Sequence, residues 1–223
     1  MINNQLKITA IIFSIILLGS VGYWLYQTSK PTAIRSILNA YNEKVFKPKG
    51  WKVCFLKDQS GLLDQTVDWC YKKWSVYDKS LTKEKLLASY KKRLHDDQLP
   101  FTMIVLDDNG KMIGMTSLKP SSGAKELKDW EKPYKAWLGT TVVNDNMQKT
   151  LLRKNMLELI QQLALQMGYT QLWWYTSDPK NNWTIEEEIA EKIQECDFRG
   201  HTIAIMRLKM HKKITEDSKK EKS

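Results

Sequence analysis

Hydrophobic positions recur along residues 51–210 with two spacings, and together they predict one α/β domain. Apolar residues three and four positions apart predict helices, whereas short apolar runs bounded by turn residues predict strands. The expected helices are Leu62 to Tyr77, Lys83 to His95, Arg153 to Met167 and Thr184 to Glu195. The expected strands are Lys52 to Leu56, Phe101 to Leu106, Lys111 to Leu118, Ala136 to Val143, Gln171 to Thr176 and Thr202 to Lys209.

Two local signals sharpen this pattern. Asn109-Gly110 lies between two apolar runs, which is a strong hairpin signal, so the strands on either side should pair antiparallel. Thr184 and Glu187 have the spacing of a capping box and predict the start of the last helix.

The stretch from Ile8 to Tyr26 contains no charged residue. As a helix it would extend about 28 Å, which is close to the thickness of the hydrocarbon core. Tyr23, Trp24 and Tyr26 gather at its C-terminal end, where aromatic rings favour the headgroup level. The pattern predicts a transmembrane anchor over residues 1–30.

A cleaved signal peptide is the competing interpretation of this segment. Lys7 supplies a positive start and Ser20-Val21-Gly22 is a loose cleavage site, but the apolar run is longer than a usual signal core. The anchor interpretation also predicts an orientation, because Lys30, Arg35 and further lysines follow the segment. By the positive-inside rule, we expect a single-pass membrane protein whose soluble domain faces the cytoplasm.

The remaining chain divides by composition. Residues 31–50 are expected to form a juxtamembrane helix and linker, residues 51–210 the folded domain, and residues 211–223 a charged, disordered tail. The formal charge of +10 comes from Lys and Arg interleaved with Asp and Glu. This distribution suits a phosphate-bearing cofactor or an anionic lipid surface better than a nucleic acid. The three cysteines match no zinc or redox spacing, so no metal site is expected.

The ordered elements resemble the GNAT acyltransferase fold over about Lys52 to Lys209. The resemblance is carried by segments that look like the second to fifth strands of that family: Leu99-Pro100-Phe101-Thr102-Met103-Ile104-Val105, Gly110-Lys111-Met112-Ile113-Gly114-Met115-Thr116-Ser117-Leu118, Ala136-Trp137-Leu138 and Met167-Gly168-Tyr169-Thr170-Gln171-Leu172-Trp173-Trp174. The family's fold is an α+β mixed sheet whose fourth and fifth strands splay apart around acyl-CoA.

The resemblance implies cofactor contacts in two places. The free edge of the fourth strand would pair with the pantetheine arm, which here implicates Thr141, Val142 and Val143. The turn that follows would hold the pyrophosphate, and in register it comprises Gln148, Lys149, Thr150, Leu151, Leu152 and Arg153. Both glycine positions of the family's turn are replaced here, by Leu151 and Arg153, so Lys149 and Arg153 would supply charge instead.

The resemblance also implies catalytic groups. The family commonly uses a tyrosine on its last helix to protonate the leaving thiolate, but Ile193 occupies that position here, and Tyr175 is the nearest substitute. Asn182 lies where these proteins often direct an asparagine toward the cofactor. Glu126, Asp129 and Glu131 precede the fourth strand and are the candidate bases that deprotonate the amine.

The sequence therefore favours a membrane-anchored N-acyltransferase that takes acetyl-CoA, or another acyl-CoA, and an amine. The alternative is a GNAT-fold module without catalytic activity that binds or scaffolds partners at the membrane, since the phosphate turn has lost its glycines.

Overall fold

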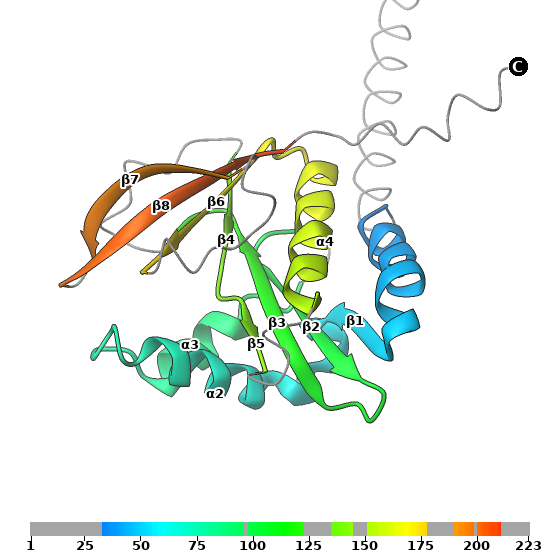
Figure 1. Cartoon of the computed structure of the whole chain (residues 1–223). Coiled ribbons are helices and arrows are strands. Elements are labelled where there is room, and N and C mark those ends of the chain that lie inside the picture. Colours follow the sequence, from blue (N-terminus) through cyan, green and yellow to red (C-terminus); the bar gives the residue numbers. More distant parts are fainter. Residues whose placement is uncertain are drawn as a thin grey trace, which may run out of the picture.

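The computed structural model describes residues 33–95, 98–122, 135–144, 151–177, 190–198 and 200–210. The strands in these ranges form an eight-stranded mixed sheet in the order β1-β2-β3-β4-β6-β8-β7, and β5 pairs with β3 beside this path. Helices cover both faces of the sheet (Figure 1): α4 and the helical segment at residues 33–41 lie on one face, and α2 and α3 lie on the other.

The chain enters the domain through the helical segment at residues 33–41, a π-helical turn η1 (Asn42–Phe46) and a 3-10 turn η2 (Lys47–Lys49). Gly50 ends this segment with φ of 71°, a left-handed conformation that glycine adopts without steric cost. The predicted membrane segment, Ile8 to Tyr26, lies outside the described residues. Within the described ranges, no helix has the length and apolar character that a membrane crossing requires.

The first half of the domain is a strand, two helices and a hairpin. These elements are β1 (Trp51–Phe55), a 3-10 segment η3 (Leu56–Leu62), α2 (Leu63–Trp74), α3 (Lys83–Lys91), β2 (Phe101–Asp107) and β3 (Met112–Lys119). The predicted hairpin is confirmed, with β2 and β3 antiparallel. Gly110 takes the left-handed conformation at its turn, and the Asp107 carboxylate accepts hydrogen bonds from the backbone N–H groups of Asn109 and Lys111.

The buried strands separate two hydrophobic clusters. Along β2, Met103 and Val105 face the cluster under α4, whereas Ile104 and Leu106 face the cluster under α2 and α3. Because successive side chains of a strand point to opposite faces, a strand covered on both sides must be apolar throughout. This arrangement explains why the sequence shows continuous apolar runs here rather than alternation.

The second half contains β4 (Lys135–Leu138), β5 (Val142–Val143), α4 (Leu152–Gln166) and β6 (Gln171–Thr176). The strand predicted over Ala136 to Val143 is thus interrupted after Leu138. Helix α4 packs closely on β3, because a Cβ atom at Gly114 would lie 2.9 Å from the Met156 sulfur. The helix stops at Gly168, which has φ of 88°.

The predicted helix from Thr184 to Glu195 is wrong over its second half. Residues Ala190–Phe198 form strand β7, which pairs antiparallel with β8 (His201–Lys209), while the predicted capping box lies outside the described residues. The register of β7 shifts between Lys192 and Gln194, so Ile193 is an extra residue in a bulge. Ile193 and Cys196 therefore pack against the same cluster although they are three positions apart, a spacing that imitates a helix.

Candidate functional site: a cleft between diverging strands

The candidate site lies where two parallel strands separate. β4 and β6 pair over Lys135–Gln171, Ala136–Leu172 and Trp137–Trp173. Beyond this point β5 pairs with β3 instead, while β6 continues along β8 as far as Thr176. The two strands therefore open around a gap that side chains from α2 and α4 border.

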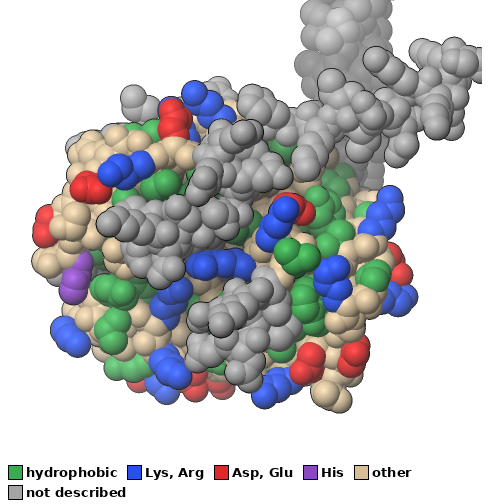
Figure 2. All heavy atoms as spheres, viewed as in Figure 1, with side chains coloured by type: hydrophobic (Ala, Val, Ile, Leu, Met, Phe, Trp, Pro, Cys, Tyr) green, Lys and Arg blue, Asp and Glu red, His purple; other side chains and the backbone are tan. Residues whose placement is uncertain are grey.

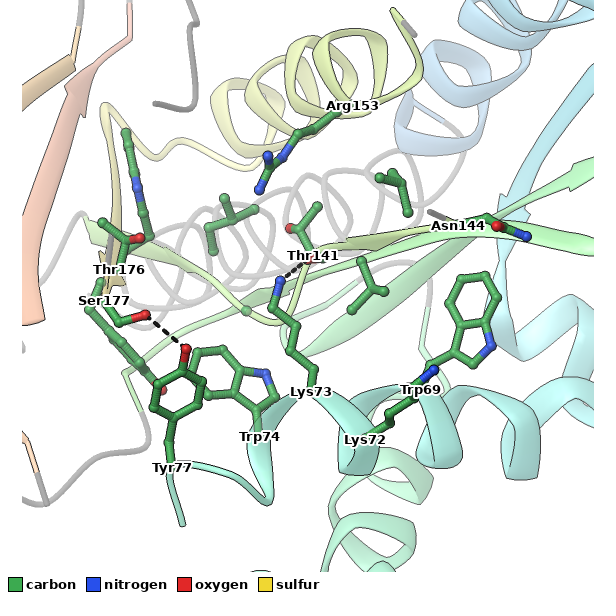
Figure 3. A pocket seen from close by; sticks show the side chains of 16 residues that line it. Trp69, Lys72, Lys73, Trp74, Tyr77, Thr141, Asn144, Arg153, Thr176 and Ser177 are labelled. Atoms are coloured by element: carbon green, nitrogen blue, oxygen red, sulfur yellow. Dashed lines mark hydrogen bonds between the residues drawn. The ribbon is translucent and has the colours of Figure 1, made fainter. Parts of the chain in front are cut away.

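A cavity of about 650 Å³ fills this opening, and we call it the splay cavity. Its walls come from α2, the segment after β4, the start of α4 and the end of β6 (Figure 3). The lining residues are Trp69, Lys72, Lys73, Trp74, Tyr77, Leu138, Gly139, Thr141, Val142, Val143, Asn144, Arg153, Trp174, Tyr175, Thr176 and Ser177. The volume is in the range of small-molecule and cofactor sites.

The segment Gly139 to Thr141 bends away from β6 and is held by β3. The Gly139 N–H donates to the Ser117 carbonyl at 2.7 Å, and the Thr116 and Thr141 hydroxyls are 2.8 Å apart. A Cβ atom at Gly139 would lie 2.9 Å from the Ser117 Cβ, so the close approach requires glycine. The bend leaves this segment lining the cavity, where no strand of the described residues pairs with it on the side of β6.

The charged groups that line the described part of the splay cavity are all cationic: Lys72, Lys73 and Arg153. Figure 3 shows Lys73 reaching from α2 to the Thr141 carbonyl, at 3.2 Å, and Arg153 projecting from α4. Burial lowers the pKa of the Lys73 ammonium, and the nearby Arg153 charge lowers it further. The Lys73 side chain is nevertheless exposed, and solvent screens its charge. Burial also lowers the pKa of Arg153, which stays charged.

An aromatic wall, made by Trp74, Tyr77 and Tyr175, closes one side of the splay cavity. The Trp74 ring lies 5.8 Å from the Tyr77 ring and 5.8 Å from the Tyr175 ring. The Trp74 indole N–H donates to the Thr140 hydroxyl at 3.0 Å, and Ser177 Oγ donates to the Tyr77 hydroxyl at 3.3 Å. The wall thus joins α2 to the bend after β4 and to the end of β6.

Comparison with family models found no match, and no curated protein matches the sequence. Among solved structures, a GCN5-related N-acetyltransferase from Kribbella flavida superposes with a TM-score of 0.55 and 12% sequence identity, over 73% of this chain and 99% of that one. The chain has the GNAT fold.

Two further GNAT-fold structures were solved with ligands. The protein yncA from Salmonella typhimurium, solved with its cofactor acetyl-CoA, has a TM-score of 0.53 and 14% identity, over 76% of this chain and 99% of that one. Spermidine N-acetyltransferase from Vibrio cholerae, in complex with CoA and spermine, has a TM-score of 0.53 and 13% identity, over 73% of this chain and 96% of that one. The splayed strands expected from the GNAT resemblance are present at β4 and β6.

The structure brings several of the residues predicted from the GNAT resemblance to the splay cavity: Thr141, Val142, Val143, Arg153 and Tyr175. At the start of α4, Leu151 is 59% exposed and Leu152 is fully buried in the core, so neither side chain lines the cavity. The other predicted residues lie outside the described ranges: Glu126, Asp129, Glu131, Gln148, Lys149, Thr150 and Asn182.

The sequence did not single out the contribution of α2. Lys73, Trp74 and Tyr77 line the splay cavity, although the spacing of apolar residues in this stretch predicts only an amphipathic helix. Lys72 and Lys73 come immediately before Trp74 in the last turn of the helix. Basic and aromatic residues together at the C-terminal end of the predicted helix were the available signal.

Proposed function

We propose that this chain is a membrane-anchored GNAT-fold N-acyltransferase that moves an acetyl or related acyl group from acyl-CoA to an amine. The observation that carries the proposal is the splay cavity, which combines an open strand edge with described charges of one sign. An open edge offers N–H and C=O groups to the amide-bearing pantetheine arm, and the cations attract its phosphates.

Several described residues fit this ligand. The backbone from Gly139 to Asn144 would accompany the pantetheine arm, since β5 uses its other edge to pair with β3. Arg153, in the first turn of α4, would supply charge to the pyrophosphate where the family's glycines are missing. Lys149 is proposed to add a second cation from the preceding turn.

The reaction would be direct transfer, without a covalent enzyme intermediate. The neutral amine attacks the thioester carbonyl carbon, an amide bond forms, and the carbon–sulfur bond breaks. The incoming ammonium group loses two protons, one before and one after attack, and one proton goes to the departing thiolate. A backbone N–H at the bend after β4 would polarise the carbonyl.

The proton transfers need an acid and a base. We assign the acid to Tyr175, because its side chain lies on the aromatic wall of the cavity at the end of β6. The base is proposed to be Asp129 or Glu131, acting directly or through water. Asn182 is proposed as a further contact to the cofactor.

The location of the protein follows from the uncharged stretch Ile8 to Tyr26 and from the lysines after it. We propose an uncleaved single-pass anchor with the catalytic domain in the cytoplasm, where acyl-CoA is present. N-terminal sequencing of the protein purified from cells tests this directly: a mature chain that starts after Gly22 would show a cleaved leader.

Isothermal titration of the full chain in mild detergent with acetyl-CoA tests the function. We expect saturable binding of acetyl-CoA and also of CoA without the acetyl group, because the proposed contacts are to the pantetheine arm and the pyrophosphate. No heat at millimolar acetyl-CoA, together with no shift in the unfolding temperature, would leave the alternative, a GNAT-fold binding module without catalytic activity.

Arg153→Gln is expected to weaken acetyl-CoA binding about tenfold, because a charge-assisted hydrogen bond contributes about 1.5–3 kcal/mol. Lys154→Gln is the matched control, since Lys154 is the next residue of α4 but does not line the splay cavity. Titration of both variants provides the measurement. If the two variants bind acetyl-CoA with equal affinity, Arg153 does not contact its phosphates.

A further inference from the structure

A second cavity of about 390 Å³ adjoins the splay cavity. Trp74, Tyr77 and Tyr175, the three residues of the aromatic wall, line both cavities. The bend after β4 also separates them, because Gly139 and Thr141 line the splay cavity whereas Thr140 lines the second. The two cavities are therefore neighbours that share the aromatic wall.

The second cavity has cationic side chains at the end of α3. Lys92 caps this helix and Arg93 follows it. Arg93 donates to the Ser89 hydroxyl at 3.0 Å, and its guanidinium carbon lies 4.3 Å from the centroid of the Tyr90 ring; neither contact is with a carboxylate. Among the described residues, neither Lys92 nor Arg93 forms an ion pair.

The described lining carries less negative charge than positive charge. Lys119 adds a third cation, and Asp78 is the one acidic residue among the described lining residues. The C-terminal end of the α3 dipole contributes about half a negative charge. Among the described lining residues, Lys and Arg thus outnumber the acidic residues, so their formal charge is positive. On the face of the molecule in Figure 2, Lys and Arg side chains are interspersed with Asp and Glu.

We propose that the second cavity binds the acceptor, and that Lys92 and Arg93 select an amine that also carries an anionic group, either a carboxylate or a phosphate. This inference rests on the proposed acyl transfer. Arg93 presents a planar fork that matches both anions, held in place by its stacking on Tyr90. Lys92, the residue before Arg93, adds a second positive charge to the lining.

A positive site also affects the amine itself. Nearby cations lower the pKa of a bound ammonium group, which increases the fraction of the neutral, nucleophilic form. The same cations disfavour an acceptor that carries several ammonium groups and nothing else. We therefore expect polyamines such as spermidine to be poor substrates.

The experiment compares matched amines with the full chain in mild detergent and acetyl-CoA. The pairs are 4-aminobutyrate with n-butylamine and O-phosphoethanolamine with ethanolamine, and spermidine is the polycation. We expect kcat/KM to be at least about tenfold higher for the anionic member of one pair. Lys92→Gln should reduce that ratio about tenfold, mainly through KM. Lys91→Gln, which removes the same charge from the same helix but does not line the cavity, should leave it unchanged.

A binding measurement separates this proposal from the transfer reaction. Titration with 4-aminobutyrate or O-phosphoethanolamine, with and without CoA, should show binding that Lys92→Gln weakens and Lys91→Gln does not. If acetyl-CoA fails to bind while this pattern holds, the acyl transfer is wrong and the anion site stands. The site is overturned if neutral or polycationic amines are preferred, if both variants behave alike, or if neither anionic amine binds.

Discussion

Tyr175→Phe is expected to lower kcat about 100-fold or more while leaving the affinity for acetyl-CoA nearly unchanged. General acids contribute about 10²–10⁴ to a rate, and this substitution removes only the hydroxyl that would protonate the leaving thiolate. The phenyl ring can keep its contacts with Trp74, at 5.8 Å, and Phe198, at 5.4 Å, so the aromatic wall should persist. Steady-state kinetics with a saturating amine provide the measurement.

The leaving group offers a sharper version of the same test. An acyl donor whose thiol has a lower pKa needs less protonation, so its rate should fall much less in Tyr175→Phe. Tyr77→Phe is the matched control, because Tyr77 belongs to the same wall and its hydroxyl accepts from Ser177. A kcat for Tyr175→Phe within threefold of the wild type, or an equal loss in Tyr77→Phe, would contradict the assignment of Tyr175 as the acid.

Trp137→Ala is expected to reduce the free energy of unfolding by about 3–5 kcal/mol, as large-to-small substitutions at buried aromatic positions do. Trp137 is fully buried at the centre of the sheet, where β4 pairs with both β3 and β6. Its ring lies 6.0 Å from that of Trp173, and the cluster around it includes Ile203 and Ile205 from β8. The loss would therefore weaken the junction from which the cleft opens.

Urea unfolding of the purified protein measures this effect. Val76→Ala is the control, because Val76 is 56% exposed and its truncation should change stability by less than about 0.5 kcal/mol. The loss in free energy of unfolding for Trp137→Phe should lie between those for Trp137→Ala and Val76→Ala, because the phenylalanine leaves a smaller void than alanine. If Trp137→Ala costs less than about 1 kcal/mol, the centre of the sheet does not carry the packing described here.

Much of the fold could be predicted because its signals are local. The hairpin between β2 and β3 followed from Asn109-Gly110, and the stripe of apolar residues in α4 followed from helical spacing. Covering the sheet on both faces makes its strands continuously apolar, so their positions were visible even where alternation was absent. The ordered elements then resembled the GNAT fold closely enough to predict splayed strands.

Two features depended on tertiary contacts that single-sequence patterns do not encode. The run Ala136 to Val143 resembles one strand, but Gly139 fits against Ser117 and the Thr140 side chain binds Trp74, so the strand breaks there. The last helix was predicted from the capping box at Thr184 and Glu187, but from Ala190 onward the chain forms β7, with a bulge at Ile193. Pairing with β8 overrode that local preference.

For the candidate site, the sequence predicted which backbone segments line the cleft better than it predicted which side chains do. Thr141, Val142, Val143 and Arg153 were placed at the cleft because the resemblance fixed the order of elements. Lys73 and Tyr77 were missed, since nothing in an amphipathic helix marks which border residues face a cleft. The cations of the second cavity were missed for a similar reason, because Lys92 and Arg93 meet Lys119 only after the chain has folded.

We propose that acyl-CoA lies in the splay cavity, along the strand edge that follows β4. Hydrogen exchange of the full chain with and without acetyl-CoA measures this directly. The ligand should slow exchange in the peptides that contain Gly139 to Asn144 and Trp174 to Ser177, and Arg153→Gln should reduce this protection at a fixed subsaturating concentration. Saturable binding that leaves both segments unprotected, with protection elsewhere in the chain, would contradict the account.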